Sequence, residues 1–194
     1  MMTKKPTEET EKLWIRTTEQ LTQAEKRQRS VDIKKIVDFL INLGYKTIKV
    51  GLDNKNRKIL CNSKTGNPIA LTENQIDELA KRLGLLSGKW MIFEPELKIN
   101  NTWAIIANLC EKEKIWSAKV STKTQQTYKV QEYVICVYTK NYLDEEDVFI
   151  MREILRQNGS ERTLYYKPDI YTILHIYSDN KHLFKLRRSS RYSA

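Results

Sequence analysis

The sequence predicts an α+β fold, in which an antiparallel sheet is backed by helices and joined to a small N-terminal helix-hairpin-helix lobe. The second half of the chain alternates β-prone runs with amphipathic patterns in the order strand, helix, strand, strand, helix, strand. This order is typical of α+β proteins. The first half instead places two helical patterns on either side of one hairpin signal. The 194 residues suit one domain with a small appended lobe.

The first half begins with a polar stretch and a helical pattern. Residues 1–21 carry mixed charge, and we expect a frayed or partly helical arm that docks through Trp14. In residues 22–43 apolar side chains recur at helical spacing, and Gly44 follows where a glycine commonly ends a helix. Between residues 47 and 61 the runs TIKV and KILC enclose the turn signal LDNKN, which predicts a hairpin.

A second helix completes the predicted lobe. Thr72 and Gln75 have the spacing of a capping box, and Gly84 ends the helical pattern. A basic hairpin beside a helix suits nucleic acid, although the same arrangement also serves as a plain packing lobe. We therefore divide the chain into a polar arm (1–21), the helix-hairpin-helix lobe (22–85) and the sheet domain (86–194).

The sheet domain is predicted from β-prone runs and two helical patterns. Asp144 caps the second helix, and the carboxylates of residues 145–147 favour its positive N-terminus, which accounts for this acidic cluster without a metal or a catalytic role. In chain order we expect a strand at 88–93, a helix capped by Asn100 or Asn101, strands at 116–122 and 133–139, the helix capped by Asp144, and strands at 164–167 and 170–177.

The formal charge of +10 is unevenly distributed. Basic side chains gather in residues 46–64, 114–130 and 181–194, and the last two segments contain no acid. If these segments converge in the fold, they suit a polyanionic partner such as RNA. The other interpretation is a lysine-rich surface that is merely solvated.

Several chemistries have no support in the sequence. The three cysteines, Cys61, Cys110 and Cys136, form no CxxC pair, so neither a zinc site nor a disulfide framework is expected. Cys110 with a distant histidine lacks a third, orienting group. No phosphate-binding glycine loop or nucleophile elbow occurs. We expect a binding protein rather than an enzyme, without cofactor or metal.

The chain shows no membrane or secretion signal. No run approaches the roughly 18 apolar residues of a membrane span, and the stretch MMTKKPTEETEK lacks an apolar signal core. We expect a cytoplasmic protein, with the nucleus also open.

Two segments are candidates for a binding face. Lys119, Ser121 and Lys123 alternate along a predicted strand, so their ammonium and hydroxyl groups point to one side and suit phosphate oxygens. In LYYKPDIYT an exposed tyrosine, taken as Tyr166, stacks a base while Lys167 holds a phosphate. The alternatives are a solvated sheet face and a bent strand whose tyrosines simply pack.

An ordered series of motifs in residues 72–194 resembles the basophilic leukemia expressed protein (Bles) family, a widespread family of uncharacterised proteins. At the C-terminus Arg188 and Arg191 depart from the family pattern, in which Pro-Ser and an apolar residue precede Tyr. The motifs are GKWMIF (88–93), NNTWAII (100–106), SAKVST (117–122), VICVYTKNYLDEEDV (134–148) and LYYKPDIYT (164–172).

The resemblance implies a fold similar to translation initiation factor 4E, a curved antiparallel sheet with helices on its convex face. That factor stacks a methylated guanine cap between two tryptophans beside a carboxylate. Here Trp90, Trp103 and Trp116 precede Met, Ala and Ser, so cap recognition does not transfer. We expect a protein that binds RNA or a phosphorylated nucleotide, or alternatively a protein-interaction module. The expected binding residues are Lys89, Lys119, Ser121, Lys123, Tyr166, Lys167 and Arg188.

Overall fold

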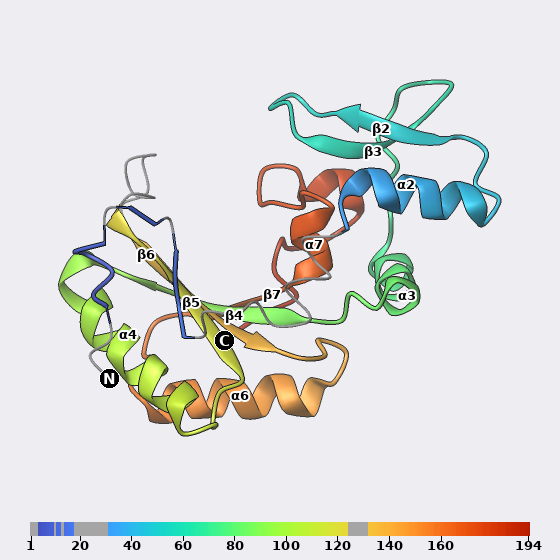
Figure 1. Ribbon diagram of the computed structural model, residues 1–194. Coiled ribbons are helices and arrows are strands. Elements are labelled where there is room, and N and C mark those ends of the chain that lie inside the picture. Colours follow the sequence, from blue (N-terminus) through green and yellow to red (C-terminus); the bar gives the residue numbers. More distant parts are fainter. Residues whose placement is uncertain (1–3, 10, 13, 18–30, 124–131) are drawn as a thin grey trace. The chain divides into compact units, whose positions relative to one another are not determined.

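The computed structural model describes residues 4–9, 11–12, 14–17, 31–123 and 132–194 (Figure 1). Contacts along the backbone divide the chain into two compact units. The first comprises residues 1–22, 87–166 and 192–194, and the second comprises residues 23–86 and 167–191. The predicted division at residues 21 and 85 stays a prediction, and the contacts add residues 167–191 to the segment that holds the lobe.

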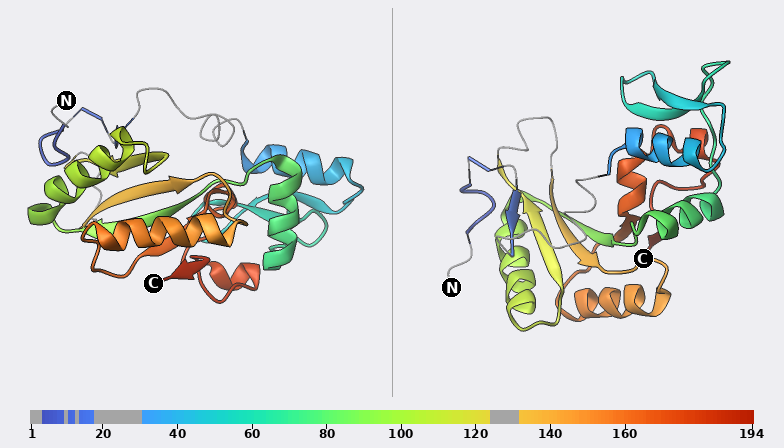
Figure 2. Two further views of the ribbon diagram at one scale, coloured as in Figure 1. Left: turned by 90° about the horizontal axis from the view of Figure 1, so that it is seen from below. Right: turned by 45° about the vertical axis from the view of Figure 1, so that its right-hand side comes forward.

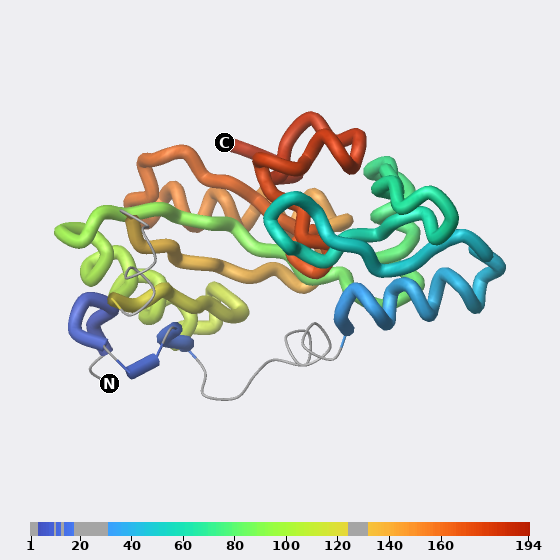
Figure 3. The backbone as a smooth tube through the Cα atoms, turned by 90° about the horizontal axis from the view of Figure 1, so that it is seen from above, coloured from blue at the N-terminus to red at the C-terminus, as the bar shows by residue number. Residues whose placement is uncertain are grey.

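The first unit is built on a six-stranded sheet, which confirms the predicted fold class. Strands β4 and β6 pair along their whole length, from Gly88 opposite Thr139 to Glu94 opposite Tyr133 (Figure 3). Each pairing with a known register is antiparallel. The sheet order is β1 (Trp14–Arg16), β5 (Ser117–Ser121), β6 (Tyr133–Thr139), β4 (Gly88–Glu94), β7 (Tyr165–Pro168) and β8 (Tyr192–Ser193).

Two helices, α4 (Glu96–Glu111) and α6 (Glu145–Gln157), cover the same face of this sheet (Figures 1 and 2). The indole N–H of Trp90 donates to the carbonyl of Val148 over 2.9 Å, so a strand side chain and a helix backbone are joined inside the core. Trp103 of α4 is also buried. Both tryptophans therefore serve packing between sheet and helices.

The ends of these helices follow local chemistry. The Asp144 carboxylate accepts from the backbone N–H of Asp147, which confirms the predicted cap. Helix α4 begins at Glu96, and its cap is Pro95, five residues before Asn100, the earlier of the two predicted caps. The φ of −69° at Pro95, which the proline ring fixes, suits this position.

The arm around Trp14 is a strand, not a helix. Trp14 lies opposite Ser121 and Arg16 opposite Lys119, at the edge of the sheet. The prediction of a partly helical arm was wrong at these residues, because a three-residue strand with a partner about a hundred residues away has no local signal.

Among its described residues, the second unit holds the hairpin and three α-helices. The hairpin is confirmed, since β2 (Ile48–Leu52) and β3 (Lys58–Asn62) pair antiparallel. Helix α3 (Glu73–Leu83) has the predicted Thr72–Gln75 capping box and ends at Gly84 in the left-handed conformation. Helix α2 (Ile33–Asn42) is capped by Asp32, and the predicted start at residue 22 lies outside the described residues. The unit also contains α7 (Asp169–Ile173) and a 3-10 turn, η1 (Lys181–Phe184).

The predicted strand at 170–177 is wrong, because this segment forms α7 and a loop. Its β-branched and aromatic residues favour a strand. However, Ile170, Tyr171, Ile173 and Leu174 are all buried, which one turn of helix achieves and an alternating strand does not. Among the described residues no helix is both long and apolar enough to cross a membrane.

Candidate functional site

The face of the sheet away from α4 and α6 carries a group of cations. Residues directly opposite each other in an antiparallel pair point to the same side. Lys119 lies opposite both Arg16 and Cys136, and Lys89 lies opposite Tyr138, two positions along from Cys136. All five therefore share one face, whereas Trp90, the neighbour of Lys89, points to the helices. We call this the basic sheet face, defined by Trp14, Arg16, Lys89, Lys119, Cys136 and Tyr138.

Aromatic rings hold the lysines of the basic sheet face. The Lys119 ammonium lies 4.4 Å from the centre of the Trp14 ring and 5.6 Å from that of Tyr138. The Lys89 ammonium lies 5.9 Å from the same Tyr138 ring. Such contacts attract a cation without cancelling its charge. The structure thus brings two of the predicted lysines together around one tyrosine.

No carboxylate belongs to the strand positions of this face. Across β1, β4, β5 and β6 the one acidic residue is Glu94. Glu94 is an even number of positions from Trp90 and therefore points to the helix side, where it is buried. The described strands thus present Arg16, Lys89 and Lys119 on one face without an acid among them.

Ser121 and Lys123 continue from the same strand. Ser121 is buried, and its hydroxyl accepts from the backbone N–H of Val134 over 2.8 Å, so it ties β5 to β6. Lys123 lies just beyond β5 with an exposed side chain, and its backbone N–H donates to the carbonyl of Pro6. Alternation along the strand does not determine which side of the sheet Lys123 faces, because the strand ends at Ser121.

The assignment of Tyr166 as the exposed, base-stacking tyrosine is corrected by the structure. Its side chain is fully buried, packs edge-on against Trp90 and hydrogen-bonds the hydroxyl of Thr139 over 2.5 Å. Tyr165 is the outward neighbour, with 40% of its surface exposed and its ring 6.2 Å from that of Phe93. Phe93 is an even number of positions from Lys89, so Tyr165 lies at the basic sheet face.

Lys167 and Arg188 belong to the second unit. Lys167 is buried, and its ammonium donates to the carbonyl of Ile176 and lies 4.2 Å from the ring of Tyr177. These contacts indicate a structural role. Arg188 is exposed and lines a separate surface hollow within the second unit. The other five predicted residues, Lys89, Lys119, Ser121, Lys123 and Tyr166, belong to the first unit.

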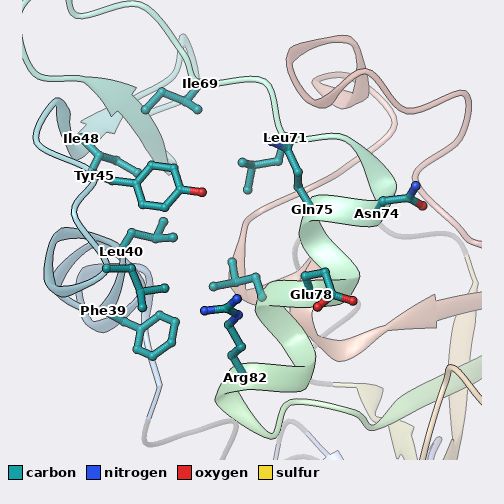
Figure 4. A pocket seen from close by; sticks show the side chains of 12 residues that line it. Phe39, Leu40, Tyr45, Ile48, Ile69, Leu71, Asn74, Gln75, Glu78 and Arg82 are labelled. Carbon is teal, nitrogen blue, oxygen red and sulfur yellow. The ribbon is translucent and has the colours of Figure 1, made fainter.

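The second unit contains an apolar groove of about 450 Å³ between α2 and α3 that the sequence interpretation missed (Figure 4). Leu43 and Tyr45 line it and remain 45% and 56% exposed. Both residues follow the end of α2. The two apolar side chains on either side of Gly44 are the sequence feature that could have indicated this groove. The apolar groove is defined by Phe39, Leu40, Leu43, Tyr45, Ile48, Ile69, Leu71 and Leu79, with Asn74, Gln75, Glu78 and Arg82 at its polar side.

An ion-pair network in the second unit fixes the hairpin turn. Arg57 pairs with Asp53 and with Asp179. Burial disfavours the charge of Asp53, but hydrogen bonds from the Arg57 side chain and from backbone N–H groups outweigh this and lower the pKa of Asp53 to about 2. A carboxylate with so low a pKa is a poor general base near neutral pH.

Neither Cys110 nor a cluster of metal-binding side chains forms a reactive centre within the described residues. Burial raises the pKa of Cys110 to about 11, which keeps this thiol protonated. Within the described residues no three side chains of His, Cys, Asp or Glu gather as a metal would require. The arrangement with the clearest chemistry is the basic sheet face, which can attract an anion.

Comparison with known proteins places the chain in a family. Two similar solved structures are of Ascaris suum eIF4E-3, one with an m2,2,7G cap and one with an m7G cap. Each is 11% identical to this chain over 68% of it and 72% of the other, with a TM-score of 0.36. So distant a likeness says nothing about a ligand of this chain. The model of the family "Basophilic leukemia-expressed protein Bles03" matches residues 2–175, and the chain therefore belongs to this family.

Proposed function

We propose that this protein binds RNA or a phosphorylated nucleotide on the basic sheet face. The observation that carries the proposal is the presence of Arg16, Lys89 and Lys119 on the sheet face opposite α4 and α6, where the described strands place no carboxylate. Ammonium and guanidinium groups donate to phosphate oxygens, and these contacts supply most of the affinity for a nucleic-acid backbone.

The side chains have different parts in this proposal. Lys119 and Arg16 contact phosphates, and Lys123 extends the positive surface past the end of β5. Lys89 is only 7% exposed, so its contribution is mainly the electrostatic attraction of its charge and its contact with the ring of Tyr138. Tyr165, beside Phe93, offers an exposed ring on which a base can stack. Ser121 and Tyr166 support the face from inside.

A pair of double variants tests the proposal. Lys119→Ala with Lys123→Ala removes two charges from the proposed face, and Lys98→Ala with Lys112→Ala removes two exposed charges from α4 and its C-cap, on the other side of the same unit. Binding of a fluorescent single-stranded RNA is measured at several salt concentrations. We expect the first variant to bind more weakly and to lose about one to two units of the logarithmic salt slope, because each lost phosphate contact lowers that slope by almost one. Equal effects in the two variants would refute the site.

The apolar groove supports a second candidate function, the docking of a partner protein. Glu78 pairs with Lys81 over 2.7 Å, whereas Arg82 has no ion pair among the described residues. The groove therefore places a guanidinium that has no direct ion pair among the described residues beside an apolar surface. The partner that fits is an amphipathic segment with apolar anchor residues and a neighbouring carboxylate for Arg82.

Peptide selection tests this second candidate. A random peptide library displayed on phage is selected against the full chain. We expect enriched peptides to combine two or more apolar anchors with an adjacent acid, to bind with little dependence on salt, and to lose binding to Tyr45→Ser. Peptides that bind Tyr45→Ser as well as the original chain would count against the groove.

A further inference from the structure

The segment that follows η1 forms a basic hollow in the second unit. Its volume is about 390 Å³, which lies within the range of roughly 300–1,000 Å³ that is usual for small-molecule pockets. The residues of the basic hollow that matter here are Glu73, Lys185, Arg187, Arg188, Ser190 and Arg191. Five of these six lie within seven consecutive positions of the chain, and Glu73 belongs to α3.

One wall of the hollow is fixed by helices. The Arg191 guanidinium contacts both carboxylate oxygens of Asp77, at 2.9 and 3.1 Å, and one oxygen of Glu73 at 3.1 Å. Its side chain is only 14% exposed. Tyr171 of α7 also lines the hollow and is buried. These contacts hold Arg191 in place, so a ligand would not have to order this arginine on binding.

The backbone of the other wall is also tied down. The Lys181 ammonium donates to the carbonyl of Arg187 over 2.8 Å. Lys185, at the end of η1, adopts a left-handed conformation with a φ of 46°, which turns the chain. The segment that presents Arg187 and Arg188 is therefore held at its start by a turn and in its middle by a charge-assisted hydrogen bond.

The formal charge of the hollow is positive. Lys185, Arg187, Arg188 and Arg191 line it, while the carboxylates are those of Glu73 in the lining and Asp77 behind Arg191. Among these described residues the positive charges outnumber the negative ones by two, and residues 180–194 contain no acid. Cations held close together repel each other, and an anion bound between them would remove that repulsion.

We propose that the basic hollow binds a phosphate monoester. Arg187 and Arg188 contact the phosphate oxygens, for which the planar guanidinium has matching geometry, and the Ser190 hydroxyl donates a further hydrogen bond. A doubly charged phosphate matches the excess charge better than a singly charged carboxylate does. The volume also accommodates part of the organic group that carries the phosphate. This site uses other side chains, in another unit, than the basic sheet face.

Calorimetric titration of the full chain with phenyl phosphate tests this site. We expect saturable binding at low salt with one site per chain. Arg187→Ala with Arg188→Ala should weaken it about tenfold or more, because charge-assisted hydrogen bonds are lost. Lys34→Ala with Lys46→Ala removes two exposed lysines from the same unit and should leave the affinity within about twofold, because screening reduces the effect of distant surface charges.

A third variant gives the opposite effect. Glu73→Gln removes a negative charge from the lining while preserving shape, and it should tighten phenyl phosphate binding severalfold. An arginine variant that had lost its fold would be revealed by its unfolding curve, and Glu73→Gln would still test the site. Absence of saturable binding to the original chain, equal weakening in both double variants, or unchanged affinity in folded Glu73→Gln would overturn the proposal.

Further titrations separate this inference from the function proposed above. Lys119→Ala with Lys123→Ala should leave phenyl phosphate binding unchanged even though it weakens RNA binding, and a parallel loss would overturn the assignment to the hollow. Once phenyl phosphate has shown the shared chemistry, a nucleoside 5′-monophosphate and a phosphoserine peptide are compared with their unphosphorylated forms. The phosphorylated forms should bind more tightly, and equal affinity with and without phosphate would contradict the proposal.

Discussion

Gly88→Ala tests the inward position of Tyr166, on which the description of the basic sheet face depends. A Cβ atom at residue 88 would lie 2.3 Å from the Tyr166 hydroxyl oxygen and 2.7 Å from the carbon that carries it. Tyr166 cannot easily retreat, because it is buried, packs against Trp90 and bonds Thr139. We therefore expect Gly88→Ala to lower the free energy of unfolding by about 1–3 kcal/mol, the usual cost of overpacking.

A double-mutant cycle sharpens this prediction. Tyr166→Phe alone leaves the Thr139 hydroxyl without its partner and should cost about 1 kcal/mol. In the combined variant the closest contact, with the hydroxyl oxygen, is absent, so the double variant should be about 1 kcal/mol more stable than the sum of the single effects predicts. Urea unfolding followed by tryptophan fluorescence gives all four values. A neutral Gly88→Ala, or strict additivity, would show that Tyr166 does not lie against residue 88.

Three further predictions concern stability, each measured by urea unfolding. Trp90→Phe should cost about 2 kcal/mol, because the buried carbonyl of Val148 loses its donor and a cavity forms; a loss below about 0.5 kcal/mol would contradict the buried hydrogen bond. Thr72→Ala should cost about 1 kcal/mol by breaking the capping box, and the same loss in a Gln75→Ala background would argue against it. The folded-state pKa of Asp53 lies below its ordinary value, so its contribution, up to about 2 kcal/mol, is present above pH 4 and is lost as the pH falls toward 2. If an Asp53→Asn variant loses the same amount of stability as the pH falls from 4 to 2, other groups cause that loss.

Much of the fold could be predicted because its signals are local. The Thr72 capping box, the Asp144 cap and the LDNKN turn each depend on residues a few positions apart. Strand β1 has no such signal, since Trp14–Arg16 are ordered by pairing with residues 119–121. In the segment 170–177, burial of Ile170, Tyr171, Ile173, Leu174 and Ile176 outweighed the β-propensity of its residues.

The candidate site was predictable only in part. Alternation along one strand correctly indicates that Lys119 and Ala118 face opposite sides. The meeting of Lys119, Arg16 and Lys89 depends on the register of three pairs of strands, which one sequence does not reveal. The incorrect prediction of Tyr166, rather than Tyr165, as the exposed tyrosine has the same cause, because a shift of one residue along a strand reverses the two faces.

Photo-crosslinking tests the central claim most directly. A single-stranded RNA containing 4-thiouridine is crosslinked to the unmodified chain, and the attached residues are located by mass spectrometry. The proposal predicts crosslinks at Trp14 or Tyr165, which lie on or beside the basic sheet face, and their loss in competition with unlabelled RNA. Crosslinks confined to α4, α6 or the second unit would contradict it.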